Sequence, residues 1–387
     1  MADGPAPLSL SLHRRIAEIP SAEWDACAGD GNPFVSHAFL SALEDSGSAV
    51  PERGWLPQHA ALRDEAGTLV GCAPCYAKSH SQGEYVFDHA WADALERAGG
   101  RYYPKLQVCV PFSPVPGPRL LTRSDAGVPA GALAQALVQA CQAVGASSVH
   151  ATFCTAEEWT ALGEAGWLQR IGTQFHWSNP GYGCFDDFLG GLASRKRKVL
   201  RRERRDVQTS GLTLRCLRGV EITERHWDAF HRFYRSTTDR KWGRSAYLTR
   251  RFWPMLGERL GDAVVLMMAE QDGVPVAGAL NLVGRDAIYG RNWGAAIDVP
   301  FLHFELCYYM AMDFAIEHGI GRVEAGAQGE HKIQRGYLPV PTYSAHWIAH
   351  RGLSGAVEEF LARERPAMMR EMEMLATLSP FRQEEPS

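Results

Sequence analysis

Two short polar segments, one in each half of the chain, constrain the fold more than any other feature of the sequence. The first polar segment, residues 80–89, begins His-Ser-Gln-Gly-Glu-Tyr, and the second, residues 326–336, begins Gly-Ala-Gln-Gly-Glu-His-Lys. Both place a carboxylate, an imidazole and an amide beside a glycine, which lets another backbone approach closely. A tripeptide repeated in matching settings indicates a duplicated unit, and we expect the two segments to converge on one pocket.

The surrounding pattern also repeats. In the first half, apolar runs predict strands over 58–63 and 69–77, joined by a hairpin turn. In the second half, the same signal predicts strands over 263–269 and 276–283. A helix and a further strand follow each hairpin, and the Asn-Pro-Gly-Tyr-Gly stretch at 179–183 is a strong chain-breaking signal between the halves. The predicted α/β domains are 1–180 and 181–387.

The composition is that of a folded globular enzyme. The chain has 387 residues, of which 45% are hydrophobic and 22% are charged, and its net charge is -4. These values argue against a disordered chain and against a protein that binds nucleic acids nonspecifically over its whole surface. The sequence contains no run of eighteen apolar residues and no signal-peptide pattern at its start, so we expect a cytoplasmic protein without a membrane span.

Nine cysteines are spaced irregularly. In a reducing compartment such residues are typical of small buried side chains rather than of disulfides. The one close pair, Cys72 and Cys75, lies inside an apolar, strand-like stretch. We therefore expect core residues there rather than a redox or metal site.

The first polar segment carries one set of candidate site residues. Glu84 and His89 are the candidates for proton transfer, because a carboxylate and an imidazole are the usual general bases. The segment leads into a helix predicted over 85–98, and a capped helix start with a buried ion pair would also explain some of its polar groups. It holds more of them than a cap requires, which favours a site. The binding candidates here and just downstream are His80, Gln82, Tyr85, Asp88, Tyr103 and Lys105.

The second polar segment is denser. Glu330 is flanked by cations, so its carboxylate should stay ionised and could accept a proton from an attacking amine. Glu330 and His331 are the catalytic candidates of this half. A solvated loop with compensated charges is the alternative, but glycines at 326, 329 and 336 favour tight turns around a ligand. The binding candidates here are Gln328, Lys332 and Arg335.

Five further candidates precede the second polar segment. His303, Glu305 and Tyr308 stand at the start of an otherwise apolar helix, where a role in the core is equally open. Helical spacing puts Glu305 and Tyr308 on one face. Arg291 and Trp293 follow a predicted strand, where they could clamp an anion or an aromatic group. A salt bridge at the sheet edge is the alternative for the arginine.

A basic run covers residues 195–205, with eight basic side chains in eleven positions. On a helix, the mutual repulsion of these charges would be relieved by a polyanion. The candidates are the phosphates of coenzyme A, a tRNA acceptor stem and an anionic cell-wall precursor. A solvated helix is the alternative. The predicted phosphate-binding residues are Arg197, Arg201, Arg202 and Arg205.

Several familiar catalytic motifs do not occur in the sequence. It lacks the GxxxxGK[ST] phosphate loop, a GxGxxG after a first strand, HExxH and a serine-nucleophile elbow. Kinase, dehydrogenase, zinc-protease and serine-hydrolase functions therefore lose support.

Long stretches of the sequence resemble the FemAB-like family of predicted N-acyltransferases, over about residues 19–364. The resemblance implies membership of the GNAT superfamily, with two GNAT-like halves built on mixed twisted sheets flanked by helices. It implies transfer of an acyl group to an amine, without a metal. The chain departs from common GNAT enzymes in having no Arg/Gln-x-x-Gly-x-Gly/Ala pyrophosphate loop. The stretches that carry the resemblance are 80–91, 102–107, 289–294, 304–309, 326–332 and 335–339.

Together these observations predict an N-acyltransferase that works by direct attack of an amine on an activated acyl donor. Acyl-CoA is the expected co-substrate, and aminoacyl-tRNA acting on a peptidoglycan-type or peptide amine is the alternative. The expected acceptor is a small-molecule or peptide amine. A non-catalytic module of the same fold, which binds a cell-wall or tRNA ligand, is the hypothesis from a different class.

Overall fold

The computed structural model describes residues 8–242, 246–326 and 329–382. The chain forms two compact units, each assembled from two stretches of sequence. Unit 1 comprises Met1–Gly172 and Pro341–Met369, and unit 2 comprises Thr173–Val340 and Arg370–Ser387. The units are therefore discontinuous, whereas the predicted domains are contiguous. Three elements run from one unit into the other: strands β9 (Leu168–Ser178) and β15 (Leu338–Ile348), and helix α12 (Arg351–Ala376).

Unit 1 contains two sheets. One has the strand order β1-β3-β4-β7, and the other runs β2-β5-β6-β8 and ends on the part of β15 that belongs to this unit. The predicted hairpin is confirmed as the antiparallel pair β3–β4. The elements are β1 (Ser9–His13), η1 (Ile16–Glu18), α1 (Ser21–Ala28), η2 (Pro33–Val35), α2 (His37–Asp45), η3 (Pro51–Arg53), β2 (Trp55–Pro57), β3 (His59–Arg63), β4 (Leu69–Ala73), β5 (Cys75–Lys78), α3 (His89–Arg97), β6 (Lys105–Val108), β7 (Leu121–Thr122), α4 (Ala130–Ala143), β8 (Ser148–Cys154) and α5 (Ala156–Glu164).

The core of unit 1 forms where α4 packs across β3, β4 and β8. Leu133, Leu137 and Cys141 recur at four-residue spacing along one face of α4 and are fully buried. Gly71 on β4 allows this approach, since a Cβ there would lie only 3.1 Å from the Leu133 side chain. Pro74 separates β4 from β5, which pairs in the other sheet, because proline has no N–H to donate to a continuous ladder.

Unit 2 contains one sheet with the order β10-β11-β12-β13-β14 and the unit 2 part of β9 at its end. The second predicted hairpin is confirmed as the antiparallel pair β11–β12. The elements are α6 (Phe185–Gly191), α7 (Ser194–Gln208), β10 (Thr213–Arg218), η4 (Gly219–Glu221), α8 (Glu224–Trp242), α9 (Phe252–Leu260), η5 (Gly261–Ala263), β11 (Val264–Gln271), β12 (Val274–Val283), β13 (Ala287–Ala295), α10 (Leu302–Phe304), a π-helical turn (Glu305–Tyr309), α11 (Met310–Glu317), β14 (Arg322–Glu324) and η7 (Glu330–Arg335).

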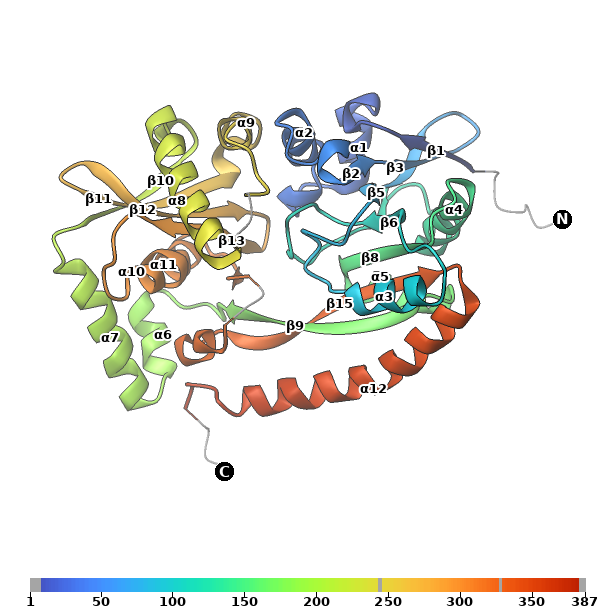
Figure 1. Ribbon diagram of the computed structural model, residues 1–387. Coiled ribbons are helices and arrows are strands. Elements are labelled where there is room, and N and C mark those ends of the chain that lie inside the picture. The colour runs from blue at the N-terminus through green and yellow to red at the C-terminus, as the bar shows by residue number, and fades with distance from the viewer. Residues whose placement is uncertain (1–7, 243–245, 327–328, 383–387) are drawn as a thin grey trace. The chain divides into compact units, whose positions relative to one another are not determined.

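Helices cover both faces of the unit 2 sheet, with α8 and α9 on one face and α10 and α11 on the other (Figure 1). Met267 lies in the core cluster beneath α11, together with Met312 and Phe314. On the opposite face, Phe230 of α8 packs close to Gly278, where a Cβ would approach its ring to 3.0 Å. The central strands are buried on both faces, which explains why they are apolar almost throughout.

Among the strand pairs described within each unit, one is parallel and the others are antiparallel. In unit 1, β6 pairs with β8 over three positions, and in unit 2, β13 pairs with β14 over three positions. Strand β13 then continues from Gly290 to Ala295 after its last contact with β14, at Tyr289 and Glu324. We call the point where these two strands part the fork. No helix in the described part of the chain is long and apolar enough to cross a membrane.

All nine cysteines are free, as the sequence predicts, but Cys184 and Cys216 are exposed, so the prediction that they are buried is wrong for these two. Cys72 and Cys75 are completely buried, and they lie on β4 and β5 as ordinary members of the core. Burial raises the pKa of the Cys75 thiol, which keeps it protonated and unreactive at neutral pH.

Candidate functional site

The first polar segment is an irregular loop between β5 and α3. The predicted helix start at Tyr85 is wrong, because α3 begins at His89. Tyr85 has a φ of 63° and Gly83 a φ of 81°, so the chain turns in the left-handed region instead of entering a helix. A non-glycine residue in that region is held there by its surroundings, and such strain often accompanies functional sites.

A buried ion cluster accounts for the conformation of this loop. The Lys105 side chain is fully buried, and its Nζ donates to the Oγ of Ser81 at 2.8 Å and to the Oε2 of Glu84 at 2.7 Å. It also donates to Asp88, which accepts a second hydrogen bond from the Tyr102 hydroxyl at 2.7 Å. Two carboxylates thus share one lysine inside the protein.

The cluster has unused acceptor capacity. Glu84 Oε1 and Asp88 Oδ1 are buried and make no hydrogen bond to any described group. Burial raises the pKa of Glu84 to about 7, despite the nearby Lys105 ammonium. Burial also acts on Asp88, but Lys105 overcomes it and holds the pKa of that carboxyl well below its usual range. Burial lowers the pKa of Lys78, whose Nζ lies 3.3 Å above the Trp55 ring, to about 7.

The other predicted residues of this segment are distributed around the cluster. The Tyr103 hydroxyl lies 2.8 Å from the Oγ of Ser81, which links it to Lys105. The Nε2 of His80 lies 3.0 Å from the carbonyl oxygen of Arg53. The Gln82 carbonyl accepts a hydrogen bond from Lys78 at 3.4 Å. Two of the predicted residues, Tyr85 and His89, are exposed.

Sequence reasoning missed two buried histidines beside this cluster. His150 on β8 and His346 on β15 face each other, with their Nδ1 atoms 2.8 Å apart. Burial and Lys105 lower the pKa of His150 to about 3, so the ring is neutral at physiological pH. These residues are 196 positions apart in sequence, and no local pattern links them.

In unit 2, four predicted residues converge at the fork. Trp293 of β13 packs edge-on against His303 of α10, with ring centroids 5.2 Å apart. His303 in turn lies 5.3 Å from the Tyr308 ring. The Tyr308 hydroxyl and the Nε2 of His331 are 3.0 Å apart, which is hydrogen-bonding distance. Tyr308 is buried, whereas the His331 side chain is exposed.

Local backbone geometry places the two hydrogen-bonded side chains. Tyr308 lies in the π-helical turn, and such turns are frequent at functional sites because they redirect side chains. Gly329 has a φ of 111°, and a Cβ there would lie 2.4 Å from the His331 ring. Only glycine therefore lets this imidazole take its position next to the tyrosine.

Three predicted residues of unit 2 are engaged by other protein groups. Lys332 donates to the carbonyls of Ala325 and Gly326, at 2.7 and 2.9 Å, and so fixes the chain after the fork. Arg335 makes a two-pronged ion pair with the buried Glu203 of α7, at 2.8 and 3.2 Å. The third, Glu305, pairs with Arg204 at 2.9 Å. Their roles in ligand binding stay predictions.

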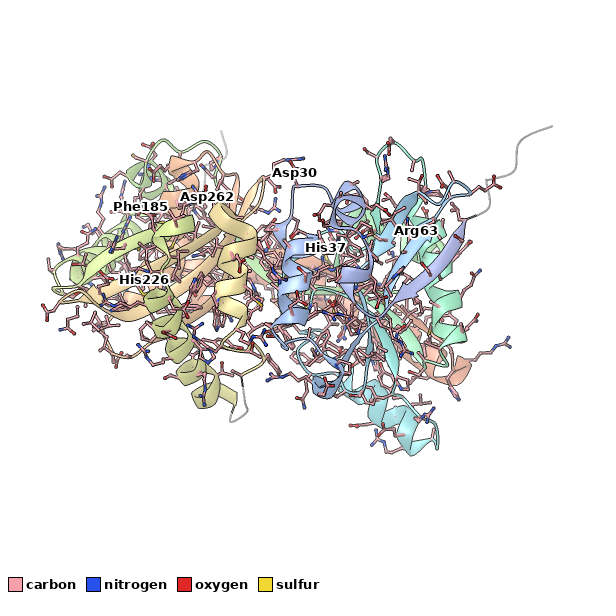
Figure 2. The ribbon with its side chains drawn as sticks, turned by 90° about the horizontal axis from the view of Figure 1, so that it is seen from above. Asp30, His37, Arg63, Phe185, His226 and Asp262 are labelled. Carbon is pink, nitrogen blue, oxygen red and sulfur yellow. The ribbon has the colours of Figure 1, made fainter. Side chains whose placement is uncertain are left out.

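Arg204 also lies over the Phe185 ring, 4.3 Å from its centroid. Phe185, labelled in Figure 2, is the first residue of α6. Two other predicted positions of the second polar segment fall outside this description. Gln328 lies outside the described residues, and so does the side chain of Glu330. The prediction that the two polar segments share one pocket concerns both units together and stays a prediction.

The fork holds a carboxylate that sequence reasoning missed. Glu324, the last residue of β14, is buried and accepts a hydrogen bond from Arg322 at 2.9 Å through Oε1. Its Oε2 has no hydrogen-bond partner among the described groups and lies 3.8 Å from the Nε2 of His176 on β9. Burial raises the pKa of Glu324 to about 7. Across the fork, Arg291 is the extra residue of a bulge between β12 and β13.

The basic run forms helix α7, as the sequence predicts. Leu200, Glu203 and Val207 are its buried positions. Arg201, one of the predicted phosphate-binding residues, forms an exposed pair with Asp186 at 2.9 Å. Arg202 and Arg205 are also exposed, and Arg197 is half-buried.

A family model described as FemAB-like, peptidoglycan biosynthesis/recognition, matches residues 15–383. The chain belongs to the FemAB-like family. No curated protein matches it significantly. Membership of this family supports a transferase activity, which is the coarse form of the function that the sequence predicts.

Solved structures show the same fold. FemX superposes with a TM-score of 0.56 at 12% identity, covering 88% of this chain and 98% of FemX. The C-terminal domain of a putative lysylphosphatidylglycerol synthetase from Agrobacterium fabrum gives 0.55 at 11% identity, covering 88% and 95%. A conserved protein of unknown function from Bacteroides thetaiotaomicron gives 0.54 at 10% identity, covering 87% and 99%. The predicted α/β fold, with mixed sheets flanked by helices, is confirmed.

Proposed function

We propose that this protein is an N-acyltransferase that moves an acyl or aminoacyl group from an activated donor to an amine. One observation carries the proposal: Trp293, His303, Tyr308 and His331, predicted separately from three parts of the sequence, lie together at the fork. The exposed imidazole hydrogen-bonded to a buried tyrosine hydroxyl offers a base. The chain of ring contacts from it reaches β13 at Trp293, where that strand continues without its parallel neighbour.

The proposed reaction is a direct displacement. The amine nitrogen attacks the acyl carbonyl, the new C–N bond forms, and the thioester or ester bond to the carrier breaks. His331 takes the proton that the amine loses, and the carrier leaves with a proton from solvent. The transfer uses the tautomer in which the Nε2–H of His331 donates to the Tyr308 hydroxyl oxygen, because Nδ1 then keeps the lone pair that accepts the proton. Backbone N–H groups of β13 beyond Tyr289 would polarise the carbonyl, as in an oxyanion hole.

Acyl-CoA is the first donor to test, since GNAT-like folds commonly use it. Aminoacyl-tRNA is the second donor class, because the sequence lacks the pyrophosphate-binding loop that coenzyme A usually requires. The likeness to FemX, which is limited to the fold, is compatible with both donors. Small-molecule and peptide amines, including those of peptidoglycan precursors, are the proposed acceptors.

The test is a donor-consumption assay. Purified protein is incubated with acetyl-CoA or with aminoacyl-tRNA and a panel of amines, and thiol release or loss of esterified tRNA is measured. We expect His331→Ala to lower turnover about a hundredfold or more, which is the usual contribution of a general base. His318→Ala is the matched control, because His318 is an exposed histidine on the same unit whose ring stacks on Phe314 of α11.

The outcomes separate the hypotheses. Turnover that depends on His331 with one donor supports the transferase and identifies its donor class. Equal activity of the His331→Ala and His318→Ala proteins removes His331 as the base. Binding of ligands without turnover of either donor, in the wild-type protein, would favour the non-catalytic module instead.

A further inference from the structure

The basic run of helix α7 contains one acidic residue, and that residue is buried. Glu203 stands among the eight basic side chains of residues 195–205, and it shares the buried side of the helix with Leu200 and Val207. An acidic residue that only offsets neighbouring cations can do so at the surface. A buried carboxylate needs specific partners, because burial removes the water that would otherwise stabilise its charge. The partners of Glu203 therefore indicate its role.

Glu203 binds both of the segments that carry the Tyr308–His331 hydrogen bond. Its Oε2 accepts a hydrogen bond from the hydroxyl of Tyr309, which lies in the same π-helical turn as Tyr308. Its two oxygens also accept hydrogen bonds from Arg335, at 2.8 and 3.2 Å, and Arg335 ends the η7 turn that holds His331. One carboxylate thus joins the turn of the tyrosine to the turn of the histidine.

Arg335 extends this connection to His331 itself. Its Nη1 donates to the His331 carbonyl oxygen at 2.9 Å, while Nε and Nη2 bind Glu203. The guanidinium carbon lies 3.3 Å from the centroid of the Phe304 ring, and that centroid lies 5.8 Å from the centre of the His331 imidazole. A two-pronged ion pair fixes the orientation of the planar guanidinium. Arg335 can therefore hold the backbone of the histidine and the ring beside it at the same time.

We propose that Glu203 and Arg335 are positioning residues, which keep the His331 imidazole at the Tyr308 hydroxyl. The effect on turnover rests on the proposed function, in which His331 takes the proton from the amine. Without the pair, the η7 turn and the π-helical turn lose their common partner, and the imidazole can leave the orientation that proton transfer requires. The pair therefore acts on kcat rather than on KM.

An ion pair of the same form in unit 1 provides the reference. Arg170 on β9 binds Glu364 of α12 with both prongs, at 2.7 and 2.9 Å, and its Nη1 donates to the Phe87 carbonyl oxygen at 2.8 Å. These hydrogen bonds are of the same kind as those of Arg335. The two pairs differ in the residue that they hold, because Phe87 has no ionisable side chain and His331 is the candidate base. Removal of the unit 1 pair therefore measures what such a pair contributes to folding alone.

The test removes the polar partners together, so that none of their side chains is left buried and unpaired. Glu203→Leu with Tyr309→Phe and Arg335→Met is the triple variant, and such apolar replacements of buried ion pairs are often neutral for stability. Arg170→Met with Glu364→Leu is the matched control. Arg335→Lys is a second variant with the same readouts, which keeps the charge but loses the planar guanidinium. Urea denaturation compares the stability of these proteins with that of the wild type.

The first readout is the NMR spectrum of ¹⁵N-labelled histidine side chains, which needs no substrate. It is recorded at about pH 9, where an ordinary imidazole is neutral and its nitrogen shifts report which nitrogen carries the proton. The His331 signal is identified by its absence from the His331→Ala protein. We expect the wild-type and control proteins to show the tautomer with the proton on Nε2. The triple variant should show the averaged shifts of an imidazole that exchanges between tautomers.

The second readout is kcat and KM with the donor that the wild-type protein consumes. We expect kcat of the triple variant to fall about tenfold to a hundredfold, because a displacement of about 1 Å can cost that much, while KM changes less than about twofold. Arg335→Lys should lower kcat about tenfold, since one ammonium cannot replace all the contacts of the guanidinium. The control should keep the wild-type kcat.

Four results would overturn the proposal. The first is an unchanged His331 signal in the triple variant, and the second is an averaged His331 signal already in the wild type. The third is an equal fall of kcat in the triple variant and the control, which would reflect folding alone. The fourth is a rise in KM at unchanged kcat, which would assign Arg335 to substrate binding. A wild-type protein that consumes neither donor would refute the proposed function, and the tautomer comparison would still decide whether the pair positions the imidazole.

Discussion

The parallel strand pairs of the two units, β6–β8 in unit 1 and β13–β14 in unit 2, have the same length and direction but different surroundings. In unit 1, the polar side chains beside the pair are buried and bind one another, with Lys105 at their centre. In unit 2, the polar side chains beside the pair reach solvent through His331. One arrangement of strands thus supports a closed ion cluster in one place and an accessible base in another.

The same contrast appears in the row of residues that stand opposite one another on three neighbouring strands of each sheet. In unit 1, His346 of β15 stands opposite His150 of β8, which stands opposite Gln107 of β6. In unit 2, the equivalent row is His176, Glu324 and Tyr289. Both rows are largely buried, yet only the second has an ionisable carboxylate at its centre. Under the proposed function, unit 1 stabilises the fold through its buried cluster and unit 2 carries the chemistry.

The largest expected effect comes from breaking the unit 1 cluster. Lys105→Met leaves Glu84 and Asp88 buried without their shared cation, and such a loss costs about 3–5 kcal/mol of the free energy of unfolding. Urea denaturation measures the change. The matched control is Arg123→Met, which removes an exposed partner of Asp125 and should leave the midpoint unchanged. Equal midpoints for the two variants would contradict a stabilising role for the cluster.

The pH dependence of stability tests the unit 2 row. Burial raises the pKa of Glu324 from 4.5 to about 7, so the folded state holds an extra proton between these values. Glu324 should therefore contribute a fall in the free energy of unfolding of up to about 3 kcal/mol as pH rises across this window. This contribution should be absent in Glu324→Gln, whereas the changes due to Glu84 and the buried histidines should remain in both proteins. Urea denaturation at several pH values measures it. Glu317→Gln, at an exposed site, is the control; parallel curves for all three proteins would refute the assignment.

The smallest expected effect concerns the orientation of the base. Tyr308→Phe removes the hydrogen bond to His331 and keeps the buried ring, so we expect kcat to fall about fivefold to tenfold with little change in KM. Tyr337→Phe is the control, because its hydroxyl only reaches the Tyr308 carbonyl at 3.5 Å. A fall of the same size in both variants would show that packing rather than orientation is responsible.

Local sequence patterns predicted much of the fold. The two hairpins and the basic helix follow from turn residues and periodicity that neighbouring residues carry. The start of α3 was not predictable in the same way. Asp88 has the sequence signature of a helix-capping residue, but its carboxylate is committed to Lys105, seventeen positions away.

The sequence predicted which residues belong to the candidate site better than it predicted which of these residues contact one another. Tyr308 and His331 stand out as polar residues in apolar or glycine-rich settings, but their hydrogen bond joins positions 23 residues apart and depends on a π-helical turn. Glu324 was missed because a single carboxylate at the end of a short strand resembles an ordinary surface residue. Only the pairing of β14 with β9 and β13 shows that it is buried.

Strands β9 and β15 each run from one unit into the other, and this has a consequence for synthesis of the chain. Strand β8 receives its antiparallel neighbour from β15, and the contacting residues His150 and His346 are 196 positions apart. While the ribosome synthesises the intervening residues, the edge of the unit 1 sheet at β8 has no strand to pair with. An exposed edge invites pairing with other nascent chains, so shortened products that stop before β15 should aggregate and should depend on chaperones.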